Sequence, residues 1–96
     1  MNFNNLEEFL SHNRGKKLIV VQGLGFVGSV MSLVCANSVS KDYAVIGVDL
    51  NTENSIKKIN DFNNGIFPLT AEDPKIDKFF NNTILQRNFY ATTDIN

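Results

Sequence analysis

Three glycines in the stretch VVQGLGFVGSVMS have a spacing that could do chemistry. Gly23, Gly25 and Gly28 form the pattern G-x-G-x-x-G between an apolar run and a segment with helical periodicity. In that setting the first glycine permits a tight turn, the second leaves room for a pyrophosphate, and the third lets helix and strand pack closely. The N–H groups at the start of the helix would then bind phosphate without any basic side chain.

An acidic residue downstream supports this interpretation. Asp49 ends the next predicted strand, 21 residues after Gly28. A carboxylate there accepts hydrogen bonds from a ribose 2′-OH and repels a 2′-phosphate, and Leu50, Asn51 and Thr52 offer nothing that would pair with such a phosphate. The pattern therefore predicts a dinucleotide site that prefers NAD over NADP. Two alternatives remain, a purely structural glycine turn and an aspartate that only caps a strand or helix end.

The single cysteine is expected to be structural. Cys35 shares a predicted helix face with four apolar residues, which are Val27, Val30, Met31 and Val34. A cysteine on such a face packs as a small apolar residue. We therefore expect Cys35 in the core and assign it no nucleophilic role.

The remaining candidates for acid–base or metal chemistry are also interpreted as structural. His12 lies in a polar segment without an identifiable acidic or cysteine partner and is expected to be exposed. Glu72 and Asp73 precede Pro74, and this arrangement favours helix capping over acid–base work. The sequence thus predicts no catalytic and no metal-binding residue.

Composition limits the classes of function. The chain has 96 residues, 43% of them apolar and 20% charged, with a net charge of -1. These values predict one small globular domain without the basic field that would attract nucleic acid or an anionic membrane. No apolar run is long enough to span a bilayer, and the N-terminus lacks a signal-peptide pattern. One cysteine allows no internal disulfide, and we expect a cytoplasmic protein.

Strands and helices alternate in the predicted order strand, helix, strand, helix, helix, strand. The expected strands are at 17–22, buried on both faces, at 43–50 and at 88–94. A short helix, capped by Asn5 and ended by Gly15, precedes the first strand, and a helix that begins at Phe26 and fades at 40–42 follows it. Two further helices are expected between the second and third strands, one from Thr52 to Asn64-Gly65 and one from Asp73-Pro74 with the apolar stripe Ile76, Phe79 and Phe80. Such alternation implies parallel pairing through right-handed crossovers. The expected fold class is α/β, a Rossmann-type βαβαβ half of a doubly wound parallel sheet. Residues 1–16 are expected to form an N-terminal helical appendage, and 17–96 a partial NAD-binding domain.

Five segments together resemble the N-terminal part of the UDP-glucose/GDP-mannose dehydrogenase family. They are GLGFVG, VIGVDLN, NNGIFP, DPKI and ATTD, in that order, and the resemblance covers nearly all of Lys17 to Asp94. It implies an NAD-dependent enzyme that oxidises the C6 alcohol of a nucleotide sugar to a uronic acid through two hydride transfers, often for polysaccharide biosynthesis. The positions that match the family's cofactor site are Gly23, Gly25, Phe26, Val27, Gly28 and Asp49.

The chain also departs from the family. The segment between Asp49 and Pro68 is a few residues longer than in well-known members, and Asn54 falls near where many carry a basic residue. The family's catalytic cysteine, its lysine and its sugar-nucleotide pocket have no matching position here. We therefore expect a cofactor-binding fragment that is inactive alone, with a stand-alone nucleotide-binding module as the alternative. Its first strand would have an exposed apolar edge, which predicts a homo-oligomer.

Overall fold

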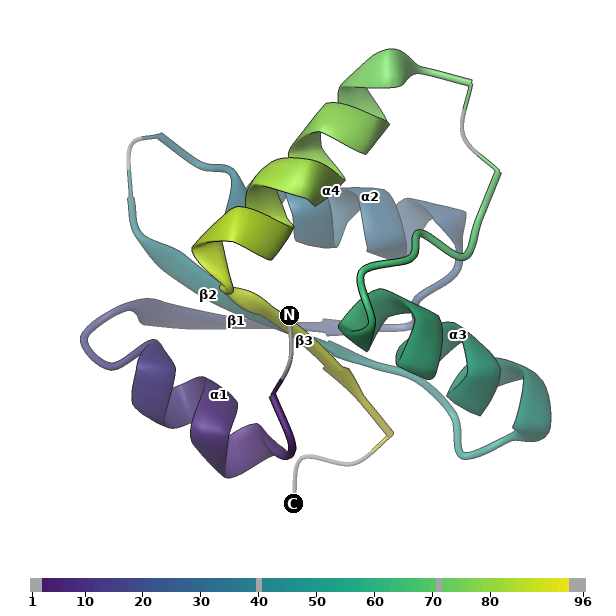
Figure 1. Ribbon diagram of the computed structural model, residues 1–96, viewed down its shortest axis with the longest axis horizontal. Coiled ribbons are helices and arrows are strands. Elements are labelled where there is room, and N and C mark those ends of the chain that lie inside the picture. The colour runs from purple at the N-terminus through teal and green to yellow at the C-terminus, as the bar shows by residue number, and fades with distance from the viewer. Residues whose placement is uncertain (1–2, 40, 71, 94–96) are drawn as a thin grey trace.

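A three-stranded parallel sheet with helices on both faces forms the centre of the chain (Figure 1). The computed structural model describes residues 3–39, 41–70 and 72–93. The elements are α1 (Leu6–His12), β1 (Lys17–Gln22), α2 (Phe26–Ala36), β2 (Tyr43–Val48), α3 (Glu53–Asn63), α4 (Pro74–Gln86) and β3 (Phe89–Thr92). This order confirms the predicted Rossmann-type α/β class. Two expected boundaries, the fading of the helical pattern at Ser40 and the strand end at Asp94, lie outside the described residues.

The strand register brings the carboxyl ends of all three strands to one edge of the sheet. The strands lie in the order β1-β2-β3, with Gln22 opposite Val48 and Val48 opposite Thr92. The side chain of Asn63 satisfies the backbone groups of Ala91 on the outer edge of β3. Its amide nitrogen donates to the carbonyl of Ala91 at 2.8 Å, and its amide oxygen accepts from the N–H of Ala91 at 2.9 Å. The outer edge of β1 pairs with no other strand among the described residues.

Two apolar clusters occupy opposite faces of the sheet, because successive side chains of a strand point to opposite sides. Val45 of β2 faces the larger cluster, formed with α2, α3 and α4, in which Phe62 and Phe89 are fully buried. Ala44 and Ile46 face the smaller cluster around Phe9 of α1. Figure 1 shows α2, α3 and α4 on one side of the strands and α1 on the other.

Side-chain caps fix most helix starts where the sequence predicts them. Asn5, Thr52 and Asp73 each accept a hydrogen bond from a backbone N–H of the first turn that follows. Gly65, with a φ of 81°, supplies the left-handed residue after α3. The predicted end of the first helix at Gly15 is wrong, because the helix ends at His12 and Gly15 lies in the turn before β1.

The predicted buried face of α2 is wrong for three of its five residues. Val27, Met31 and Val34 are 74%, 51% and 47% exposed, whereas the buried residues are Ser29, Ser32, Leu33 and Ala36. The reason is the close approach of the start of α2 to the end of β1, where a Cβ on Gly28 would overlap the carbonyl oxygen of Gly23, so that small side chains such as Ser29 and Ser32 face the sheet. Three of the four buried residues are small. Val27, Met31 and Val34 therefore point outward, whereas Val30 and Cys35 of the predicted face pack partly buried against the larger cluster.

The first strand is not buried on both faces as predicted. Ile19 and Val21 pack against the larger cluster, but Leu18 and Val20 are 50% and 46% exposed on the other face. There α1 covers β2 and β3, through Phe9, and does not extend over β1. As expected, β1 lies at the edge of the sheet, with no second partner strand among the described residues, and its exposed apolar side chains are Leu18 and Val20.

Candidate functional site

The glycine loop between β1 and α2 has the conformation that the motif predicts. Gly23 has a φ of 92°, a region that residues with a Cβ rarely adopt, and its N–H donates to the carbonyl of Val48 at 2.7 Å. A Cβ on Gly28 would overlap the carbonyl oxygen of Gly23. Leu24, between the first two glycines, is fully buried in the larger cluster and anchors the loop. The turn therefore requires two of its three glycines for geometric reasons alone.

The middle glycine has no such internal reason. A Cβ on Gly25 would meet no atom within 4 Å, and its φ of -68° is open to any residue. Gly25 is the N-cap of α2, yet no side chain of the described residues caps this helix start. Because the first N–H groups of a helix have no partner within it, those of α2 are available to an anion. The space beside Gly25 and the uncapped helix start fit a pyrophosphate.

Asp49 lies directly after β2 and faces the loop. Its Oδ2 accepts a hydrogen bond from the N–H of Leu24 at 3.0 Å, and its Oδ1 accepts one from the N–H of Leu50 at 2.7 Å. The carboxylate thus bridges the end of β2 and the glycine loop. These contacts fix the direction of the carboxylate beside the start of α2.

A lysine also contacts this carboxylate. The Nζ of Lys58 on α3 lies 2.9 Å from Oδ2 of Asp49, and the side chains of Lys58 and Asp49 are 21% and 11% exposed. Burial raises the pKa of the Asp49 carboxyl, but hydrogen bonds from Lys58, Leu50 and Leu24, together with the charge of Lys58, outweigh it. The pKa of Asp49 therefore lies below its usual value of 3.8. At neutral pH the group is an ionised acceptor.

Lys58 is the residue of this site that the sequence reasoning missed. That reasoning compared Asn54 with the family's basic position, but Asn54 is exposed. Lys58 follows four residues later, one helical turn along α3, and so points in nearly the same direction from the helix. The greater length of the segment after Asp49 is the sequence signal that could have found Lys58, because a longer segment can move the basic residue to a later position of the helix.

A cavity of about 400 Å³ lies at the carboxyl edge of the sheet. Its lining residues are Gln22, Gly23, Val48, Asp49, Leu50, Asn51 and Thr93. Of the six predicted cofactor residues, Gly23 and Asp49 line this cavity. Gly25, Phe26, Val27 and Gly28 lie at the adjoining start of α2, where Phe26 and Val27 are exposed. The fold thus brings all six residues to one edge of the sheet.

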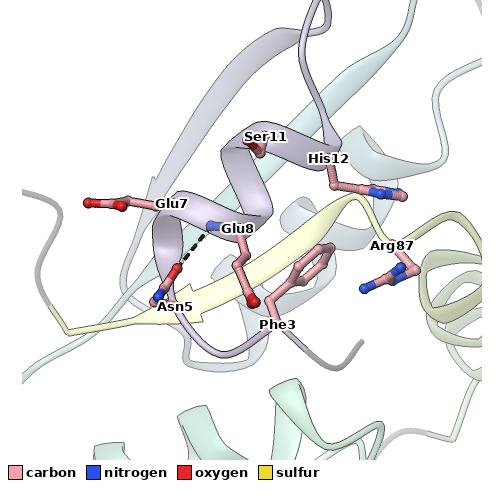
Figure 2. A pocket seen from close by; sticks show the side chains of 7 residues that line it. All are labelled: Phe3, Asn5, Glu7, Glu8, Ser11, His12 and Arg87. Atoms are coloured by element: carbon pink, nitrogen blue, oxygen red, sulfur yellow. Dashed lines mark hydrogen bonds between the residues drawn. The ribbon is translucent and has the colours of Figure 1, made fainter.

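A second hollow, of about 470 Å³, lies beside α1 and away from the glycine loop. Figure 2 shows its lining, in which Glu7 points away and Phe3 lies between Glu8 and Arg87. The guanidinium of Arg87 lies 4.5 Å from the centre of the Phe3 ring. Both oxygens of Glu8 accept hydrogen bonds from Asn4. Side chains of both charges line this hollow, including Glu7, Glu8 and Arg87, and no glycine of the motif contributes to it.

His12 and Asp73 lie where the sequence predicts, and Cys35 is less buried than predicted. Cys35 is partly buried and packs against the larger cluster, and His12 is exposed. Asp73 caps α4 through the N–H of Lys75 at 2.9 Å. Within residues 3–39, 41–70 and 72–93, no three histidine, cysteine, aspartate or glutamate side chains gather closely enough to hold a metal ion. No helix in these ranges is long and apolar enough to cross a membrane.

Comparison with known families decides what kind of domain carries this site. A sequence model of the UDP-glucose/GDP-mannose dehydrogenase family, NAD binding domain, matches residues 17–96. The chain belongs to the UDP-glucose/GDP-mannose dehydrogenase family. This assignment confirms the predicted resemblance, and it identifies NAD as the cofactor of the domain.

A solved structure supports the assignment. The chain is similar to the NDP-N-acetyl-D-galactosaminuronic acid dehydrogenase from Methanosarcina mazei Go1, with 28% sequence identity and a TM-score of 0.72. The match covers 97% of this chain and 19% of that enzyme, so the chain spans about a fifth of its length. No curated protein sequence matches the chain. Both the matched family and this structural neighbour are dehydrogenases.

Proposed function

We propose that this chain is the cofactor-binding part of an NAD-dependent nucleotide-sugar 6-dehydrogenase, which oxidises the C6 alcohol of a UDP- or GDP-sugar to a uronic acid. The observation that carries the proposal is the uncapped start of α2 beside Gly25, at the same sheet edge as Asp49. The family match and the dehydrogenase neighbour support the substrate class. When bound, NAD supplies the hydride acceptor for the alcohol carbon.

Each residue of the proposed site has a separate part in holding NAD. The backbone N–H groups of Phe26, Val27 and Gly28 bind the pyrophosphate, which approaches over Gly25. Asp49 accepts a hydrogen bond from a hydroxyl of the adenosine ribose. None of these groups takes or gives a proton during hydride transfer, and the described residues offer no nucleophile at this edge. The chain by itself is therefore expected to bind the cofactor without oxidising a nucleotide sugar.

Isothermal titration of the 96-residue chain with NAD tests the proposal. We expect saturable binding by the wild-type chain, together with a rise in melting temperature, because a ligand that binds only the folded state stabilises it. The change Gly25→Val should abolish binding and leave the melting temperature without ligand nearly unchanged, because its side chain enters open space. Absence of NAD binding by the wild-type chain, or unaltered binding by Gly25→Val, would contradict the proposal.

The partners and location follow as further parts of this proposal. A nucleotide sugar is the substrate of the parent enzyme, which acts in the cytoplasm and serves polysaccharide biosynthesis. The isolated chain self-associates through exposed apolar side chains next to β1, which has no second partner strand among the described residues. These side chains are Val27, Met31 and Val34 on α2 and Leu18 and Val20 on β1, each 46% exposed or more. An apolar surface next to an unpaired strand edge favours contact between copies.

A further inference from the structure

We propose that Lys58 sets the margin by which this domain prefers NAD over NADP, by neutralising the carboxylate of Asp49 at the ribose end of the site. This inference rests on the proposed function, because it concerns the same cofactor site. Lys58 affects the choice of cofactor through its contact with the carboxylate of Asp49. The pair lies at one contact of 2.9 Å, with both side chains mostly withdrawn from water.

Helix packing fixes Lys58 in this position. The buried residues of α3 are Ser55, Ile59 and Phe62. Lys58 lies three residues after Ser55 and four before Phe62, so its side chain leaves the helix near the buried face. Its neighbour Lys57 is exposed and makes no ion pair within the described residues. These two adjacent lysines carry the same charge, and they differ in burial and in contact with Asp49.

The net charge of the Asp49–Lys58 pair affects how strongly the site repels the 2′-phosphate of NADP. A lone Asp49 carboxylate presents one negative charge to the phosphate of NADP, which is itself doubly negative near neutral pH, and repels it. With Lys58 at 2.9 Å the pair has no net charge. The repulsion that usually excludes NADP from such a site is then weakened. We expect NAD to remain preferred, but by a narrower margin than a lone aspartate would give.

The hydrogen-bond capacity of Asp49 explains why NAD still binds better. A carboxylate offers about four acceptor positions. Leu24 and Lys58 use two of them on Oδ2, and Leu50 uses one on Oδ1. Among the described residues no further donor occupies Oδ1, which leaves one position for a ribose hydroxyl, and a phosphate in the hydroxyl's place has no proton to donate there. The preference for NAD thus rests on this hydrogen bond as well as on charge.

Titrations with NAD and with NADP test the inference in three lysine variants of the full chain. We expect Lys58→Met to weaken NADP binding on the order of tenfold more than NAD binding, because one unit of charge a few ångströms from the phosphate is removed. Lys58→Arg keeps the charge and should restore the wild-type ratio. Lys57→Met removes an equal charge without the contact and should leave the ratio unchanged. Asp49→Asn should reduce the preference for NAD over NADP, because the positive charge of Lys58 is then no longer paired and attracts the 2′-phosphate.

A measurement without cofactor tests the ion pair itself. We expect the pKa of Asp49, followed by the carboxyl ¹³C shift in NMR, to rise in Lys58→Met and to stay unchanged in Lys57→Met. An unchanged Asp49 pKa in Lys58→Met overturns the inference, as does an unchanged NAD-to-NADP ratio in a chain that still binds NAD. Failure of the wild-type chain to bind NAD is a different result, which overturns the proposed function and the assigned specificity together.

Discussion

The carboxylate of Asp49 accepts a hydrogen bond from the N–H of Leu24 at 3.0 Å, across 25 residues of sequence. Leu24 is fully buried and Asp49 follows the central strand, so this contact joins the core, the glycine loop and the ribose end of the site. The glycine loop is therefore bonded to β2 through Gly23, to Asp49 through Leu24 and to α2 through Ser29. These contacts hold the start of α2 in place in the absence of a ligand. Such preorganisation lowers the ordering cost of binding.

The glycines of the motif should separate into structural and ligand-facing positions when each is changed to alanine. Gly28→Ala should destabilise the fold by about 1–3 kcal/mol, since its Cβ would overlap the carbonyl of Gly23. Gly25→Ala should leave the free energy of unfolding almost unchanged and still weaken NAD binding. Urea denaturation and calorimetric titration check the pair. Equal loss of stability in both variants would argue that Gly25 is structural too.

Stability should fall in acid partly because of Asp49. Its pKa is lowered in the folded state, so its ionised form stabilises the fold above the unfolded value of 3.8, and this contribution is lost as pH falls through the folded value. Asp49→Asn removes the titration and should flatten the dependence of stability on pH below about 4. Denaturation midpoints of both proteins between pH 2 and 6 measure this. Parallel curves of stability against pH for the two proteins would show that the ionised carboxylate of Asp49 does not stabilise the fold.

The aromatic centre of the larger cluster should dominate the stability of the domain. Phe62 is fully buried and its ring lies 5.4 Å from that of Phe89 and 6.1 Å from that of Phe80, in edge contacts. Phe62→Ala should cost about 3–5 kcal/mol and lower the melting temperature by more than about 10 °C. Leu85→Ala, at a position 82% exposed, is the control and should change it little. Similar melting temperatures for both variants would contradict this packing.

Self-association should depend on the outward face of α2. Met31 is 51% exposed in the middle of the apolar stripe, so Met31→Lys should leave the fold intact and shift the chain toward monomer. Leu85→Lys adds the same charge at an exposed position of α4 and should not. Sedimentation velocity over a concentration series distinguishes the two. A wild-type chain that stays monomeric at high concentration would refute the proposed oligomer.

Much of the fold could be predicted because its signals are local. The caps at Asn5, Thr52 and Asp73 are formed within three residues, and the turn at Gly23 depends on the φ of a single residue. The alternation of strands and helices then limits the topology to parallel crossovers. Such features need no knowledge of distant contacts, which is why the sequence predicts the α/β class and brings the glycine loop and Asp49 together.

What the sequence alone determined, then, is the order of the elements and the residues at the carboxyl edge of the sheet. Only the tertiary structure decided which face of α2 is buried, because the close approach of Gly28 to Gly23 selects small side chains over apolar ones. It also decided that Lys58 meets Asp49, since that contact depends on how α3 is rotated against the sheet. Both outcomes arise from packing between segments far apart in the chain, and apolar periodicity within one segment does not encode them.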